Sequence, residues 1–196
     1  MTFTRTAIPD VILIDPKVHG DERGYFVETF RGDKLSEFLG YTLNFCQDNE
    51  SKSSYGVLRG LHYQLPPHAQ TKLVRVIEGE VLDVAVDIRE GSPTFGQHVA
   101  VRLSGDNKSQ MLIPRGFAHG FVVLSETCTF AYKVDNYYSP ECDRGIAFND
   151  PAININWIVE QDKMQLSLKD TKQPLLADAD LFEYGVNLYT QKGTHV

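Results

Sequence analysis

The sequence predicts an all-β protein built as an antiparallel sandwich or barrel. Short strand-like runs dominate the chain, turn residues separate them at close intervals, and only one segment has a clear helical pattern. Many short strands at this spacing are typical of antiparallel sandwiches and barrels. The length of 196 residues suits one domain. We expect it to span residues 1–196, with the tail from about residue 162 packing on the barrel.

The strands are expected in segments where apolar residues alternate or run together between turn residues. In chain order these segments are 11–14, 25–30, 44–48, 57–64, 72–77, 81–88, 98–103, 110–113, 117–124, 127–134 and 145–148. Segment 81–88 alternates most clearly, with Leu82, Val84, Val86 and Ile88 on one face.

A single helix is expected near residue 35. Asp33 can cap it, Leu35, Phe38 and Leu39 form an apolar stripe, and Gly40 ends it.

Composition excludes several classes of partner. The net charge of −7 argues against a general nucleic-acid-binding face, and no apolar run is long enough to suggest a membrane span. The three cysteines are widely spaced and lack a C-x-x-C pair, which is typical of reduced thiols. The sequence therefore predicts a cytoplasmic protein without nucleic-acid or membrane partners.

Charged residues in apolar strands indicate a ligand pocket. Arg59, His62, Lys72 and His119 lie in strand-like segments, where an unpaired charge costs several kcal/mol. A lone strand histidine is usually a satisfied core residue, but here four such groups occur together. Alternation puts Arg59 and His62 on opposite faces, so they share a pocket only if the strand contains a bulge or twist.

The segment Pro114-x-Gly116-x-x-His119 resembles the second signature of the cupins, small β-barrels that often hold a metal. Metal cupins have an H-x-H pair on an earlier strand, whereas this chain has His62-Tyr63-Gln64. Because a metal site needs three or four donors, no metal is expected. The resemblance implies a cupin-type jelly-roll β-barrel with a few short peripheral helices.

An ordered set of short motifs runs along the chain from residue 21 to residue 151. It comprises DERGYFVE (21–28), QDNES (47–51), LRGLHYQ (58–64), KLVRV (72–76), DIR (87–89), SPTFG (92–96), IPRGFAHGF (113–121), YK (132–133), YYSP (137–140) and NDP (149–151). The set resembles the dTDP-4-dehydrorhamnose 3,5-epimerase family. The resemblance implies inversion of C3 and C5 of dTDP-4-dehydro-6-deoxy-D-glucose to give dTDP-4-dehydro-L-rhamnose.

Proton abstraction beside a ketone requires a base, a cation that stabilises the enolate, and an acid on the opposite face. By resemblance, His62 is the base, Asp170 orients it, Lys72 stabilises the enolate oxygen, and Tyr132 returns the proton. This chemistry requires no cofactor.

The resemblance also assigns substrate-binding residues. Arg23, Arg59 and Lys169 match positions that hold the diphosphate, and Tyr138 matches an aromatic residue that stacks on thymine. The remaining predicted binding residues are Phe26, Glu28, Gln47, Asp48, Asn49, His119 and Asp143.

The chain departs from the family pattern at two positions. Asp143 stands where a glutamate is expected, and Phe148 stands where tryptophan is usual. We expect a weaker or water-mediated contact at Asp143 and a packing change at Phe148.

The family works as a homodimer, with part of each nucleotide site supplied by the partner's N-terminal strands. Three alternatives remain at this stage. They are an epimerase acting at C3 only or C5 only, a 3,4-ketoisomerase on the same barrel, and a non-catalytic cupin that binds ligand. The His62–Asp170 pair argues against the last, because a simple binder has no need of it.

Overall fold

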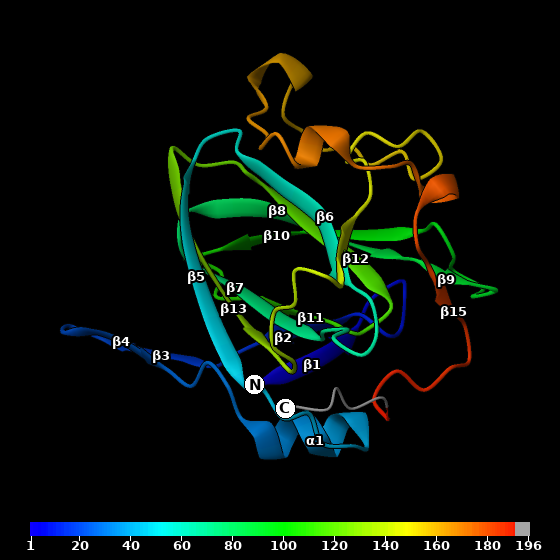
Figure 1. Ribbon diagram of the computed structural model, residues 1–196. Coiled ribbons are helices and arrows are strands. Elements are labelled where there is room, and N and C mark those ends of the chain that lie inside the picture. Colours follow the sequence, from blue (N-terminus) through cyan, green and yellow to red (C-terminus); the bar gives the residue numbers. More distant parts are fainter. Residues whose placement is uncertain (191–196) are drawn as a thin grey trace.

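Two antiparallel sheets form the body of the protein in the computed structural model, which describes residues 1–190 (Figure 1). The six-stranded sheet has the order β1 (Thr2–Arg5), β2 (Ile12–Asp15), β11 (Gln110–Ile113), β7 (Lys72–Glu78), β13 (Thr127–Val134) and β5 (Gln47–Ser54). The five-stranded sheet has the order β10 (His98–Ser104), β8 (Glu80–Asp87), β12 (Phe117–Val123), β6 (Leu58–Gln64) and β14 (Asp143–Gly145). The all-β prediction is therefore confirmed.

Smaller elements surround these sheets. The hairpin of β3 (Val18–Asp21) and β4 (Gly24–Val27) projects from the body, and α1 (Gly32–Leu39) lies below the six-stranded sheet in the view of Figure 1. Strand β9 (Arg89–Glu90) pairs in parallel with β15 (Phe182–Glu183). Three single-turn 3₁₀ helices, η1 (Gln161–Lys163), η2 (Asp170–Lys172) and η3 (Leu176–Asp178), lie in the C-terminal segment.

Apolar side chains are buried on both faces of the sheets. Between the sheets, Val74, Ile113 and Phe130 pack with Val81 and Ala85. Burying apolar surface in this way is the main force that holds such layers together.

The outer faces are covered as well. The predicted stripe from Leu82 to Ile88, on β8 and the residue after it, packs outward against the C-terminal segment, including Trp157 and Leu176. Leu35 of α1 packs on Leu73 and Leu112 of the six-stranded sheet. Because apolar side chains also pack on the outer faces, the two sheets can enclose polar groups between them and still be stabilised by apolar burial.

Most predicted strands match the observed ones within a few residues, but three differ. The strand expected at 44–48 runs from Gln47 to Ser54, because pairing with β13 stabilises a polar run that has little strand propensity by itself. The strand expected at 145–148 is β14, Asp143–Gly145, and the one expected at 25–30 is β4, Gly24–Val27. The sequence patterns did not indicate β1, β3, β9 or β15.

The helix is found where it was expected, but Asp33 does not cap it. Arg31 occupies the N-cap position without a side-chain cap hydrogen bond, and Asp33 lies in the first turn, where its carboxylate pairs with Arg31 at 2.6 Å. A carboxylate in the first turn still favours the helix through its dipole. Gly40 follows the last helical residue, as predicted.

Candidate active site

A cavity of about 580 Å³ lies between the two sheets. Strands β5, β6, β7, β12 and β13 contribute its walls, and residues 165–170 of the C-terminal segment close one side. Seven of the predicted site residues line it: Asn49, Arg59, His62, Lys72, His119, Tyr132 and Asp170.

A bulge in β6 brings Arg59 and His62 to the same face. His62 pairs with His119 and Arg59 pairs with Phe121, so three steps along β6 match two steps along β12. The extra residue reverses the alternation between the two positions. Gly60 lies inside the bulge with φ at +135°, and a Cβ there would come within 2.5 Å of the Gly120 Cα, so only glycine fits.

His62 and Asp170 form a hydrogen-bonded pair inside the cavity. The Nε2 of His62 lies 2.5 Å from the Oδ1 of Asp170, whose carboxylate is only 4% exposed. Burial acts to raise the pKa of Asp170, but the hydrogen bonds from His62 and Ser167 outweigh it and hold the pKa below its usual value. Because Nε2 faces the carboxylate, Nδ1 is the ring nitrogen left for a ligand.

Lys72 lies beside this pair on β7. Its Nζ donates to the backbone carbonyl of His62 at 3.3 Å. Burial lowers the pKa of Lys72 to about 8, the carboxylates of Asp83 and Asp143 oppose that effect, and Lys169 adds to it. At neutral pH the amine of Lys72 is thus a cation that lies close to the backbone carbonyl of His62 in β6.

His119 is held by Asp83, a residue that the sequence patterns did not single out. Its Nε2 lies 3.0 Å from both carboxylate oxygens of Asp83, which is fully buried on β8. Burial nevertheless lowers the pKa of His119. An aspartate within the apolar run 81–88 is itself a signal, because a buried carboxylate requires a partner.

Tyr132 comes from the sheet opposite to His62. It lies on β13 next to Phe130, with ring centroids 6.3 Å apart, whereas His62 lies on β6 of the five-stranded sheet. Burial raises the pKa of Tyr132, although nearby Arg59 acts to lower it. The phenol is therefore protonated at neutral pH.

Comparison with known proteins identifies the family. The sequence profile of the dTDP-4-dehydrorhamnose 3,5-epimerase family matches residues 5–178. A protein of that name from Pseudomonas aeruginosa is 56% identical over 182 residues, which cover 93% of this chain and 99% of the relative. The chain belongs to the dTDP-4-dehydrorhamnose 3,5-epimerase family.

Solved structures agree with this assignment. A dTDP-6-deoxy-D-glucose-3,5-epimerase from Legionella pneumophila, crystallised with dTDP-4-keto-L-rhamnose, is 51% identical, has a TM-score of 0.90, and covers 94% of this chain and 99% of its own. A 3'-monoepimerase from Streptomyces bikiniensis is 32% identical with a TM-score of 0.81, covering 88% of this chain and 86% of its own. The predictions of a cupin-type jelly-roll and of epimerase activity are confirmed.

A polar cluster of this epimerase lies near Lys72. The Oδ2 of Asp143 accepts hydrogen bonds from Tyr138, at 3.0 Å, and from Lys169. The carboxylate of Asp143 thus has two partners within its own chain, Tyr138 and Lys169. Phe148 packs against the core, and its backbone carbonyl accepts a hydrogen bond from the Trp157 indole at 2.8 Å.

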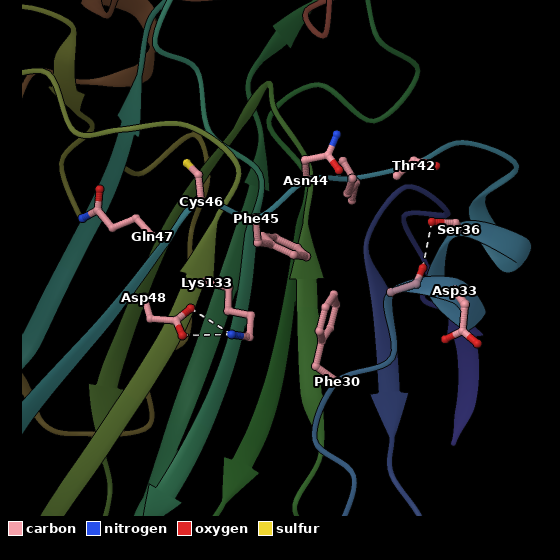
Figure 2. A pocket seen from close by; sticks show the side chains of 12 residues that line it. Phe30, Asp33, Ser36, Thr42, Asn44, Phe45, Cys46, Gln47, Asp48 and Lys133 are labelled. Carbon is pink, nitrogen blue, oxygen red and sulfur yellow. Dashed lines mark hydrogen bonds and ion pairs between the residues drawn. The ribbon is translucent and has the colours of Figure 1, made fainter.

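Two predicted residues of β5 lie apart from this cavity. Asp48 points to the opposite face and pairs with Lys133 at 2.9 Å, beside a second cavity of about 800 Å³ (Figure 2). Gln47 also lines that second cavity, but its amide donates to the Oδ1 of Asn49 at 2.8 Å. The structure therefore connects Gln47 with the site through Asn49 and leaves Asp48 on the outer side.

Three other predicted residues lie on or just after the projecting hairpin. Arg23 pairs with Asp21 and its side chain is 90% exposed, Phe26 is 66% exposed, and Glu28 lies beyond β4 near Arg31. None of the three lines the cavity of its own chain.

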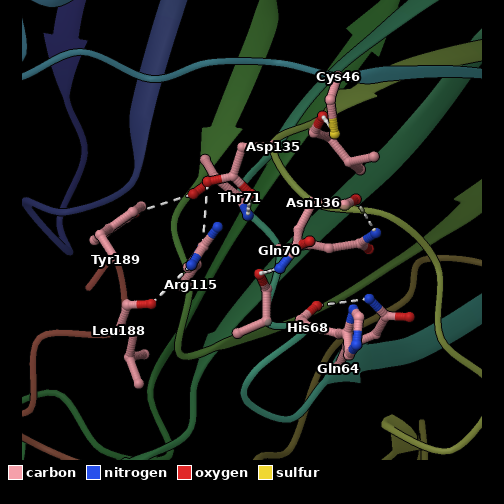
Figure 3. Close-up of polar contacts among 12 residues, drawn as sticks. Cys46, Gln64, His68, Gln70, Thr71, Arg115, Asp135, Asn136, Leu188 and Tyr189 are labelled. Carbon is pink, nitrogen blue, oxygen red and sulfur yellow. Dashed lines mark hydrogen bonds and ion pairs between the residues drawn. The ribbon is translucent and has the colours of Figure 1, made fainter. Parts of the chain in front are cut away.

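A buried polar network fixes the ends of the strands that carry Lys72 and Tyr132 (Figure 3). Asp135, directly after β13, accepts from the Thr71 backbone N–H at 2.6 Å and from Arg115 at 3.2 Å. Arg115 also donates to the carbonyl of Leu188 at 2.7 Å. These contacts tie the C-terminal segment to both strands.

Further observations concern residues 1–190. No helix in this range is long and apolar enough to cross a membrane. No group of three or more His, Cys, Asp or Glu is placed there to hold a metal ion. Cys46, Cys128 and Cys142 are free thiols.

Proposed function

We propose that this epimerase inverts C3 and C5 of dTDP-4-dehydro-6-deoxy-D-glucose to give dTDP-4-dehydro-L-rhamnose by proton abstraction at both carbons. The observation that carries the proposal is one cavity holding a His62–Asp170 pair and Lys72, with Tyr132 supplied by the opposite sheet. Relatives named for this activity, at 51–56% identity, support the choice of substrate.

His62 acts as the base through Nδ1. The C3 and C5 protons are acidic because each carbon adjoins the C4 ketone, and neutral imidazole is a suitable base near pH 7. Asp170 holds the ring through Nε2 and stabilises the imidazolium that forms. Lys72 stabilises the negative charge on the enolate oxygen.

Tyr132 returns a proton to the opposite face of the planar enolate. Its hydroxyl stays protonated because burial raises its pKa. A donor and an acceptor on opposite sheets give inversion, whereas His62 alone would return the proton to its original face. Since these side chains supply the base, the acid and the enolate cation, the reaction requires no cofactor.

The substrate's nucleotide is bound by residues of two chains. Arg59 lines the cavity, and Lys169, Tyr138 and Asp143 lie beside it, which suits a diphosphate and a stacked base. The exposed hairpin with Arg23 and Phe26 projects from the body of the chain (Figure 1), and neither residue lines the cavity of its own chain. We propose that it reaches the cavity of a second copy in a homodimer, and that the dimer works in the cytoplasm.

The proposal is tested by two histidine variants. His62→Ala is expected to lower product formation from the dTDP-4-keto sugar by at least about 10²–10⁴-fold, as for loss of a positioned base. His98→Ala is the matched control, because His98 lies on β10 and does not line the cavity. Equal activity of the two variants would remove His62 from the mechanism.

A further inference from the structure

Asp170 is not part of the barrel, and its contact with His62 depends on how the C-terminal segment is attached. The segment reaches β6 through Gln165, which forms a parallel bridge with Val57. The N–H of Gln165 donates to the carbonyl of Gly56 at 2.9 Å, and its carbonyl accepts from the N–H of Leu58 at 3.0 Å. These bonds bring residues 165–170 to the edge of the cavity.

The approach at this bridge is close. Gly56 has φ at +76°, and a Cβ there would lie 2.2 Å from the carbonyl oxygen of Lys163. A backbone contact of this kind needs glycine. The C-terminal segment is therefore held against the start of β6 at Gln165, which precedes Asp170 by five residues.

Ser167 makes the last connection. Its hydroxyl donates to the Oδ2 of Asp170 at 2.9 Å and accepts from the backbone N–H of Asp170 at 3.1 Å. The other carboxylate oxygen, Oδ1, faces His62. The two oxygens of Asp170 thus have different partners, and rotation of the carboxylate would break both contacts.

We propose that Ser167 is a positioning residue for the proton-abstraction step. It holds the carboxylate of Asp170 in the one orientation that aligns the His62 ring, and it acts only through Asp170. This inference rests on the proposed roles of His62 and Asp170. It adds one positioning residue, which orients Asp170, to the four predicted catalytic residues.

The test uses Ser167→Ala, Ser167→Thr, Asp170→Ala and the double variant Ser167→Ala/Asp170→Ala. Ser167→Ala is expected to lower kcat about 5- to 30-fold, equivalent to about 1–2 kcal/mol, because one hydrogen bond that fixes the carboxylate is lost. The KM of the substrate should change less than about twofold, and solvent deuterium uptake should slow by the same factor as kcat.

Two comparisons separate positioning from a general structural effect. Ser167→Thr keeps the hydroxyl, and Ser167 is exposed enough to accept a methyl group, so activity should return to within about threefold of the parent. In the Asp170→Ala background, Ser167→Ala should cause no further loss, because no carboxylate remains to be held. Ser36→Ala is the matched control. It removes a hydroxyl that donates a hydrogen bond to the Gly32 carbonyl in α1, away from His62 and Asp170, and should keep parent activity.

The outcomes distinguish this inference from the proposed mechanism. If Asp170→Ala is fully active, the proposed role of Asp170 itself fails. If Asp170→Ala is impaired but Ser167→Ala is not, or if the two losses multiply, only the role of Ser167 is overturned. Should Ser167→Ala fail to fold, Ser167→Cys replaces it and is expected to show the same loss of kcat, because a thiol is a weak donor.

Discussion

The charge of Lys72 should set the alkaline limit of activity. Burial lowers its pKa from the ordinary value of 10.5 to about 8, so the ammonium form is present below that pH and is lost above it. With a pKa near 8, about nine-tenths of the enzyme carries the cation at pH 7 and about one-tenth at pH 9. Because only the cation stabilises the enolate, kcat/KM should fall roughly tenfold between these two pH values.

Neighbouring charges should move this limit in opposite directions. Lys169 lowers the pKa of Lys72, so Lys169→Gln should shift the alkaline limb of kcat/KM to higher pH. Asp83 acts to raise the same pKa, so Asp83→Asn should shift the limb to lower pH. Because both variants retain Lys72, a change in the pH of the alkaline limb reports a change in the charges around Lys72.

The assay is a pH profile of initial rates at low substrate concentration, from pH 6 to about 10, for the parent and both variants. Lys72→Gln should have low residual activity and no alkaline limb. A parent profile that stays flat to pH 9.5, or a limb that lies at one pH in all variants, would refute the assignment of the limb to Lys72.

Three further predictions concern the acid, the nucleotide and metals. Tyr132→Phe should still exchange substrate protons with D₂O while forming far less inverted product, and parallel loss of both by NMR would count against the acid role. Arg59→Ala should weaken dTDP binding by about 1.5–3 kcal/mol in calorimetry if it makes a charge-assisted contact, whereas Arg102→Ala, at a surface pair with Glu80, should bind normally. Exhaustive chelation with EDTA should leave full activity, and a loss reversed by a divalent ion would contradict the metal-free chemistry.

The sequence predicted the apolar strands well. The observed strands β8 and β13 match the predicted segments within one residue, and β8 is buried on both faces, not on one alone. Strand β5 was poorly predicted because its inward residues, such as Asn49 and Ser51, line a polar cavity instead of a core. Local propensity is least informative where a strand serves a binding site.

The geometry of the site depended on features that the patterns did not show. Strict alternation separated Arg59 from His62, and the bulge at Gly60 brings them together. The role of Asp170 came from family resemblance, since a lone aspartate in a mixed tail has no periodic signal. Asp83 was missed because its partner, His119, is distant in sequence. Ser167 was missed because it contacts Asp170, whose own importance comes from its tertiary contact with His62.

The most direct test of the mechanism is the deuterium content of the product formed in D₂O. The account requires that both the C3 and C5 protons leave the substrate and that solvent-derived protons replace them. Product from the parent enzyme should therefore carry deuterium at both carbons, as read by NMR and mass spectrometry. Deuterium at one carbon only would identify a monoepimerase, and inverted product without deuterium would contradict proton abstraction by His62.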